Sequence, residues 1–295
     1  MPTMKQGTQL FLCGTVTLWS SALVGIRLGL AGGYSPGSLA LLRYLIASLL
    51  LIIPYSQLPQ RTIPNWRDAL RIILIGTIGI GLYNLMLNYG ETVVPASIAG
   101  FIIGLMPVFT LFFAFLIIKE SIPRKIWWGI FTSLGGLLLI AVNERGGFAF
   151  DKGLLCILAA AMCGSFYAVA QKKLLLRYHP LELVILSIWG GTLILCLYFP
   201  QMLHDLPQAS AQGTLAAIYL GIFPGAVAYT LWNYALSRTH AGRASGYLYT
   251  MPLITALLGA IILQEYPEPL ELFGGLITLA GAVYIHFAYK QMRSR

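Results

Sequence analysis

Long apolar stretches, separated by short polar segments, follow one another along almost the whole chain. A bilayer core about 30 Å thick needs a helix of about 20 apolar residues. A window of that length predicts ten spans, at residues 8–30, 37–55, 69–88, 95–117, 125–142, 153–173, 181–199, 213–235, 243–263 and 270–289. The alternating pattern of a transmembrane barrel is absent from the sequence. The pattern therefore predicts an all-α integral membrane protein with ten transmembrane helices.

The second half of the sequence repeats the first with one change of register. Equivalent pairs are Ser21 and Ser165, Tyr34 and Tyr178, and Pro36 and Pro180 at an offset of 144, then Asn88 and Asn233, Pro107 and Pro252, and Glu120 and Glu265 at an offset of 145. We therefore predict a first repeat at 8–142 and a second at 153–289, which together form one structural unit. Because each has five helices, an odd number, the second copy is expected to be inverted in the membrane, as in many secondary transporters.

Composition and charge agree with this prediction. Hydrophobic residues make up 58% of the 295 residues and charged residues 10%, which excludes a soluble enzyme, a disordered chain and a secreted disulfide scaffold. With the N-terminus in the cytoplasm, 15 of the 19 Lys and Arg residues fall on the inner side. The net charge of +9 therefore indicates topology rather than nucleic-acid binding. We expect a multi-pass protein of the plasma (inner) membrane, with the lipid bilayer as a partner and both termini cytoplasmic.

Several short motifs recur in order along the two halves. They are Leu18-Trp19-Ser20-Ser21, Leu42-Arg43-Tyr44, Pro107, Lys119-Glu120 and Gly135-Gly136 in the first half, and Pro252, Gln264-Glu265 and Gly274-Gly275 in the second. This set resembles the EamA-type repeat of the drug/metabolite transporter superfamily. The resemblance implies a ten-helix carrier, commonly an exporter of amino acids or other small metabolites. The second half departs from the pattern, because Met162-Cys163-Gly164 replaces the Leu-Trp-Ser of the first span.

Polar and aromatic side chains inside the spans are the candidate substrate-binding residues. Asn84 and Asn88 share one helix face, and their repeat partners Tyr229 and Asn233 share the matching face of a later helix. Polar groups are costly in lipid, so we expect them to face the interior. The alternative is that they only make interhelical hydrogen bonds and aromatic contacts. The candidate set is Trp19, Ser20, Tyr83, Asn84, Asn88, Tyr167, Gln171, Tyr229, Trp232, Asn233 and Tyr247.

Three prolines inside the spans are candidate hinges. Pro107 and Pro252 are repeat equivalents near mid-span, and proline removes a helix donor and favours a kink. Pro224 has Gly79 at its equivalent position. The alternative is an ordinary tilted helix.

Few titratable side chains lie within the spans. Arg43 would either bind a substrate carboxylate or snorkel to the outer surface, and the sequence favours snorkelling. Glu91 and His286 are the remaining candidates for a charge role, and strong proton coupling through a buried carboxylate is poorly supported. All four cysteines lie in predicted spans and are expected to pack as small hydrophobes, with no metal site. No cofactor or hydrolase motif is present, so no enzymatic activity is expected.

The sequence thus favours a secondary transporter that exports small organic metabolites, such as amino acids or amphipathic amines, by alternating access. The alternative is a non-transporting membrane receptor or assembly partner, which would need no central cavity. We expect a small-molecule substrate, no nucleic-acid partner, and either a monomer or a homodimer.

Overall fold

The computed structural model describes residues 6–58, 61–118, 124–143, 152–239, 244 and 246–292. In these ranges the chain forms helices joined by short connections, with no strand. The first half contains α1 (Gln6–Ala31), α2 (Pro36–Ser56), α3 (Trp66–Gly76), η1 (Thr77–Leu82), α4 (Tyr83–Gly90), α5 (Ala96–Ile103), α6 (Met106–Ile118) and α7 (Arg124–Asn143). The second half contains α8 (Lys152–Ala170), η2 (Leu174–Leu176), α9 (Pro180–Leu195), η3 (Cys196–Tyr198), α10 (Phe199–Asp205), α11 (Ala211–Leu220), η4 (Gly221–Ala228), α12 (Tyr229–Arg238), η5 (Gly246–Thr250), α14 (Met251–Leu258), η6 (Gly259–Leu263) and α15 (Pro269–Met292).

Eight of the described helical segments are long and apolar enough to cross a membrane. They are Gln6–Ala31, Pro36–Ser56, Trp66–Gly90, Ala96–Ile117, Lys152–Leu176, Pro180–Asp205, Ala211–Arg238 and Gly246–Leu263. Two further apolar stretches, Lys125–Leu139 and Pro269–Gly281, are shorter in the described part of the chain. In the described residues every predicted span overlaps with helix, and the structure supports eight spans by length and composition.

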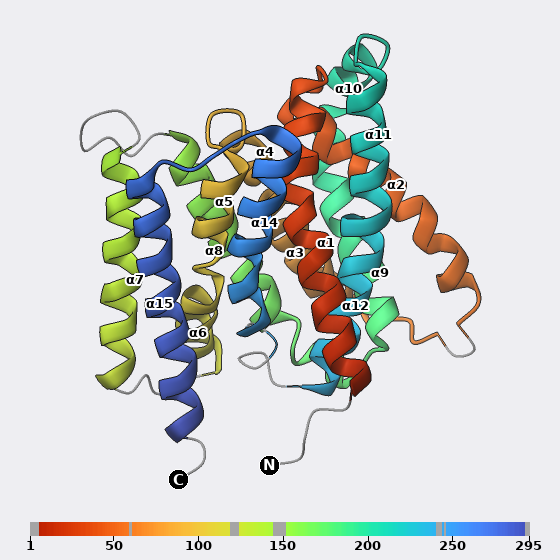
Figure 1. Cartoon of the computed structure of the whole chain (residues 1–295). Coiled ribbons are helices and arrows are strands. Elements are labelled where there is room, and N and C mark those ends of the chain that lie inside the picture. The colour runs from red at the N-terminus through yellow and green to blue at the C-terminus, as the bar shows by residue number, and fades with distance from the viewer. Residues whose placement is uncertain are drawn as a thin grey trace.

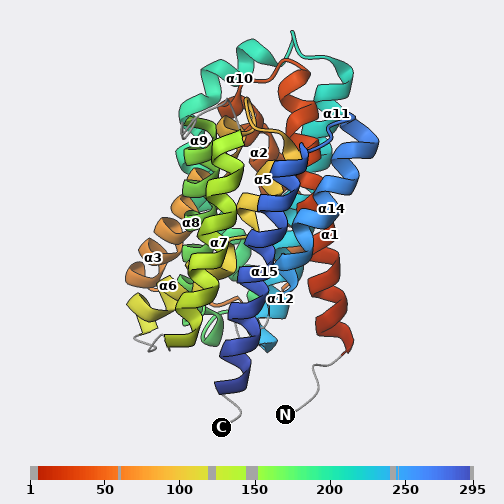
Figure 2. The same ribbon diagram turned by 60° about the vertical axis from the view of Figure 1, so that its left-hand side comes forward.

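The helices form a bundle with both ends of the chain on one side (Figure 1). α1 begins and α15 ends at the same end of the bundle, which we call the terminal end. α8 begins at the opposite end, which we call the far end, so α1 and α8 run in opposite directions (Figure 1). α7 and α15 pack against each other along the flank of the bundle (Figures 1 and 2).

The two halves make equivalent hydrogen bonds. Asn88 donates to the carbonyl of Pro36 at 2.9 Å, and Asn233 donates to the carbonyl of Pro180 at 3.4 Å. The residues of each pair are 144 or 145 positions from their counterparts, which is the spacing of the sequence repeat.

A second set of contacts corrects the predicted register of the first helix. Ser165 Oγ donates to the carbonyl of Met106, and Ser20 Oγ donates to the carbonyl of Met251. The structural equivalent of Ser165 is therefore Ser20, at an offset of 145, and not Ser21 as the sequence match predicted. The offset therefore changes from 145 to 144 between this serine and Tyr34, and returns to 145 between Pro36 and Asn88.

The exposed helix faces are strongly apolar, as lipid contact requires. All four cysteines are free thiols, but Cys13 and Cys196 are exposed on the outside of the bundle. These two lie in predicted spans but face outward from the bundle. The sequence could not reveal this, because a lipid-facing cysteine and a core cysteine have the same apolar neighbours.

Candidate functional site

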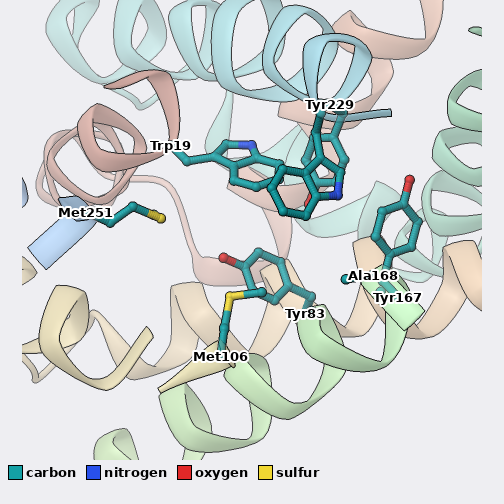
Figure 3. Close-up of a pocket in the computed structure, with 10 residues that line it drawn as sticks. Trp19, Tyr83, Met106, Tyr167, Ala168, Tyr229 and Met251 are labelled. Carbon is teal, nitrogen blue, oxygen red and sulfur yellow. The ribbon is translucent and has the colours of Figure 1, made fainter. Parts of the chain in front are cut away.

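A small cavity lies where residues from both halves of the chain meet (Figure 3). The free space is about 20 Å³, enough for about one water molecule. Its walls come from α1, η1, α4, α6, α8, α12 and α14, so both halves contribute. The lining residues are Trp19, Gly79, Tyr83, Met106, Gly164, Tyr167, Ala168, Tyr229, Trp232 and Met251.

Aromatic rings dominate this cavity, and Tyr229 is their common neighbour. The centre of its ring lies 5.1 Å from that of Trp19, 5.9 Å from that of Tyr167 and 6.4 Å from that of Tyr44. The rings of Trp19 and Trp232 are 5.3 Å apart. These separations are typical of tilted and edge-to-face pairs, which hold aromatic side chains in fixed orientations. The cavity therefore has rigid walls on one side.

Two methionines complete the cavity opposite the rings. The thioethers of Met106 and Met251 both point toward Tyr83 and Trp19 (Figure 3). They are repeat equivalents, and each begins a new helix directly after a break in its span. Flexible thioethers adapt their shape to irregular ligands, so this wall can rearrange more easily than the aromatic one.

The helix breaks themselves are stabilised by serine and threonine side chains. The carbonyl of Met106 accepts hydrogen bonds from Ser165 and Thr110, each at 2.8 Å. Ser20 donates to the carbonyl of Met251 at 3.4 Å. The first carbonyls of a helix already accept bonds from within it, so these side chains add links between helices at the starts of α6 and α14. Ser20 therefore lies behind the cavity wall, where it links α1 to the start of α14, and does not line the cavity.

The structure places a helix break directly before Pro107 and a change from 3₁₀-helix to α-helix directly before Pro252. α5 ends at Ile103 and α6 begins at Met106, while η5 passes into α14 at Met251. The third proline, Pro224, lies inside the π-helix η4, and the equivalent segment around Gly79 is also a π-helix, η1. The irregular backbone in these segments therefore does not depend on the proline.

Arg43 is buried beside the cavity and does not reach the membrane surface. Its side chain is 2% exposed, and Nη1 donates to Asn84 Oδ1 at 2.8 Å. Asn84 in turn donates to the hydroxyl of Tyr44 at 2.7 Å. The snorkelling interpretation is therefore wrong, because this face of α2 packs on α4 and η4 rather than on lipid. Arg43 Nε has no hydrogen-bond partner among the described residues.

A second polar group lies toward the terminal end of the cavity. The hydroxyl of Tyr167 approaches Asn233, Ser187 and Gln171, all of which are completely buried. Polar atoms of all four side chains lack a hydrogen-bond partner among the described residues. Buried polar groups are normally satisfied, so these atoms are available to a bound molecule. The sequence missed Ser187, which its position as the repeat equivalent of Arg43 could have revealed.

A charged group lies at the far end of the bundle. Arg27 Nε donates to Glu265 Oε1 at 2.9 Å, and Arg27 Nη1 donates to the backbone carbonyl of Glu91 at 2.6 Å. The second oxygen of Glu265 accepts from the backbone N–H of Ala96. Glu91, one residue beyond the span Trp66–Gly90, is completely buried, and neither carboxyl oxygen has a partner in the described part of the chain. Burial raises the pKa of this carboxyl well above its ordinary value.

The remaining candidates lie elsewhere. Tyr247 is in η5, half-buried against the core, and does not line the cavity. Asn88 holds the start of α2. The side chain of His286 and the residues Lys119 and Glu120 lie outside the described parts of the structure. Tyr44, Met106 and Met251 were not predicted; a methionine directly before the mid-span proline in both halves was the available indication.

Comparison with known proteins identifies related chains. The model of the EamA-like transporter family matches twice, at residues 7–142 and 151–287. The chain is 34% identical to the "uncharacterized transporter YdfC" of Bacillus subtilis, over 94% of this chain and 90% of the relative. It is 35% identical to a "probable terminal-alkyne amino-acid exporter" of Streptantibioticus cattleyicolor, over 92% of this chain and 91% of the relative. A solved crystal structure shares the fold with a TM-score of 0.69 at 20% identity, covering 98% of this chain and 99% of the other.

Proposed function

Because this chain belongs to the EamA-like transporter family, we propose that it exports small organic metabolites that carry a carboxylate, amino acids among them, by alternating access. That it is a multi-pass membrane transporter, and not an enzyme, follows from the family and from the names of its relatives. The observation that carries the choice of substrate is the buried, incompletely paired guanidinium of Arg43 beside an aromatic cavity.

The proposed architecture is ten transmembrane helices in two inverted repeats of five. The opposite directions of α1 and α8 and the equivalent hydrogen bonds of Asn88 and Asn233 support it. In this architecture the terminal end is cytoplasmic, as the Lys and Arg distribution predicts. Two inverted halves can exchange conformations, which gives inward-open and outward-open states of one fold.

Arg43 provides the proposed site for the substrate carboxylate. A buried cation is costly unless it is paired, and guanidinium binds carboxylate in a two-pronged geometry. Among the described residues, Arg43 donates one side-chain hydrogen bond, to Asn84. Its Nε has no partner there. The surrounding rings of Trp19 and Tyr229 suit an apolar side chain, and they attract an ammonium group through their faces.

The size of the cavity indicates that it must widen for transport. About 20 Å³ holds one water molecule and not an amino acid. Substrate entry therefore requires the walls to separate, and the breaks before Pro107 and Pro252 are the proposed hinges. A cavity to which both halves contribute, and whose lining residue Tyr167 has no hydrogen-bond partner for its hydroxyl among the described residues, favours a carrier over a non-transporting receptor.

Counterflow in proteoliposomes tests this proposal. The probes are labelled amino acids with apolar side chains and the matched amines that lack the carboxylate. We expect wild-type protein to move the amino acids, and Arg43→Met to lower that flux about tenfold or more, since a hydrogen bond to a charged group contributes about 1.5–3 kcal/mol. Amine flux should fall much less.

Arg67→Met is the matched control, because Arg67 is an exposed arginine at the start of α3. Its flux should equal that of wild type. The absence of flux for every amino acid and amine in wild-type vesicles would contradict the transport proposal. Equal amino-acid flux in Arg43→Met and wild type would contradict the carboxylate site alone.

A further inference from the structure

The carboxyl of Glu91 is the buried titratable group that substrate binding leaves unexplained. It is completely enclosed at the far end of the bundle, and both of its oxygens lack a partner among the described residues. Its own backbone carbonyl, however, is held by Arg27, 2.6 Å away. The side chain thus lies next to a cation whose closest carboxylate partner is Glu265 instead.

The charged groups around Glu91 come from three parts of the chain. Arg27 on α1 and Arg43 on α2 favour the ionised carboxyl, while Glu265, between η6 and α15, disfavours it. α5 contributes no titratable side chain. α8 packs against the end of α4 through Gly153 and Ile157, and its charged residue is Lys152. The other titratable side chains of α8 are uncharged when protonated, and they are Cys156, Cys163 and Tyr167.

The Arg27–Glu265 pair closes the far end of the bundle. It links α1 to the end of η6, and Glu265 also holds the start of α5 through the N–H of Ala96. Both side chains are partly exposed, at 29% and 18%, so the pair lies at the boundary between the interior and the surface. Under the proposed function, the outward-open state requires α1 and the η6 end of the chain to separate here.

We propose that Glu91 is a proton-binding site at the outer gate of the carrier. Its carboxyl is neutral while Arg27 is paired with Glu265. When the gate opens and this pair separates, Arg27 pairs with Glu91, and the proton leaves the carboxyl for the outer solution. The released proton carries its charge into the outer solution, Arg27 exchanges one carboxylate partner for another, and Glu265 becomes free to contact the outer solution.

The inner end of the bundle serves as an internal comparison. Lys172 is the repeat equivalent of Arg27, and it donates to the carbonyl of Leu236, the repeat equivalent of Glu91. It also donates to the carbonyl of Thr239 at 2.6 Å. The backbone contact is therefore present at both ends, but the position that Glu91 occupies at the outer end is taken by Leu236 at the inner one. The proposed proton site is thus specific to the outer gate and rests on the proposed inverted architecture.

The direction of the pH effect follows from burial. The closed gate raises the pKa of Glu91, whereas solvent and Arg27 lower it again in the open gate. The closed state therefore binds more protons. It is favoured below the pKa of the open state, and this advantage is lost as the external pH rises through the pKa of the closed state.

A single reporter cysteine measures the gate without any substrate. Ala168, which lines the cavity, is changed to Cys in protein whose four native cysteines are replaced by Ser. A membrane-impermeant maleimide is then added to the outer side of oriented vesicles at external pH values from about 5 to about 8. We expect labelling in the Glu91→Gln background to stay low, because Gln remains neutral, and labelling in wild type to rise about tenfold above it, the change that one pKa unit represents.

The reporter thiol itself ionises as the pH rises and then reacts faster with the maleimide. Comparing wild type with Glu91→Gln at the same pH removes this effect. Glu268→Gln, an exposed carboxylate changed at the same end of the bundle, should follow the wild-type profile. Identical profiles for Glu91→Gln and wild type would overturn the proton site and leave the transport proposal intact. A thiol that is never labelled from the outer side would contradict alternating access, and the proton site with it.

Discussion

At the scale of residues, the cavity depends on one position at which the two halves carry different side chains. Trp19 fills its place in the first half, and the equivalent place before Ser165 is Gly164. A Cβ at Gly164 would lie 2.8 Å from Met106 Cε and 3.1 Å from Tyr83 Cε2. The missing side chain therefore leaves the room into which Met106 and Tyr83 project.

Gly164→Leu should fill this room and block the path. We expect substrate flux to fall by about tenfold or more, because the methionine end can move only into the remaining 20 Å³. Membrane insertion should be unchanged. Counterflow in proteoliposomes measures the loss, and Gly135→Leu is the control, since a Cβ at Gly135 meets nothing within 4 Å. Wild-type flux in Gly164→Leu would show that substrate does not pass this point.

The sequence revealed the aromatic part of this site more readily than its other parts. Tyr229 was predicted because it is the repeat partner of Asn84, and Tyr83 and Tyr167 because they add aromatic surface at helical spacing. Met106 gave no such indication, since an apolar side chain in an apolar helix looks the same whether it faces a cavity or lipid. Arg43 was placed wrongly because its depth in the span was known, but the neighbour of its helix face was not.

At the scale of elements, the interrupted spans position the cavity. A new helix begins one residue before each proline, and the carbonyl of its first residue accepts a hydrogen bond from a serine on the neighbouring helix. The sequence predicted the location of these irregularities at Pro107 and Pro252 from the missing donor of proline. It could not predict the π-helix η1, because the glycines at 76, 79 and 81 permit close packing without specifying a backbone hydrogen-bond pattern.

Pro107→Ala combined with Pro252→Ala tests the hinges. Alanine restores a donor and removes the clash, which favours a continuous helix by about 3 kcal/mol per site. We expect flux to fall about fivefold or more while a bound amino acid still raises the melting temperature of the purified protein. Pro269→Ala at the exposed start of α15 should change neither quantity. Faster flux in the double variant would contradict a hinge role.

At the scale of the whole molecule, the two halves present matched closures at opposite ends. Arg27, near the end of α1, donates to a backbone carbonyl at the end of α4. Lys172, at the end of α8, does the same at the end of α12, the repeat equivalent of α4. The last carbonyls of a helix lack partners within it, so a cation there is favourable. The repeat and the span boundaries were readable from the sequence, but this pairing of ends was not, because it joins residues 64 positions apart through the fold.

These closures predict opposite effects of two otherwise similar substitutions. Arg27→Met should weaken the outer closure and increase labelling of Ala168→Cys from the outside, whereas Lys172→Met should weaken the inner closure and increase labelling from the inside. We expect about a tenfold shift in each case, because a hydrogen bond to a charged group contributes about 1.5–3 kcal/mol. An impermeant maleimide, applied to right-side-out and inside-out vesicles, measures both. If both variants shifted labelling toward the same side, the two ends could not be alternating gates, since loss of one closure in an inverted repeat must favour opening at that end alone.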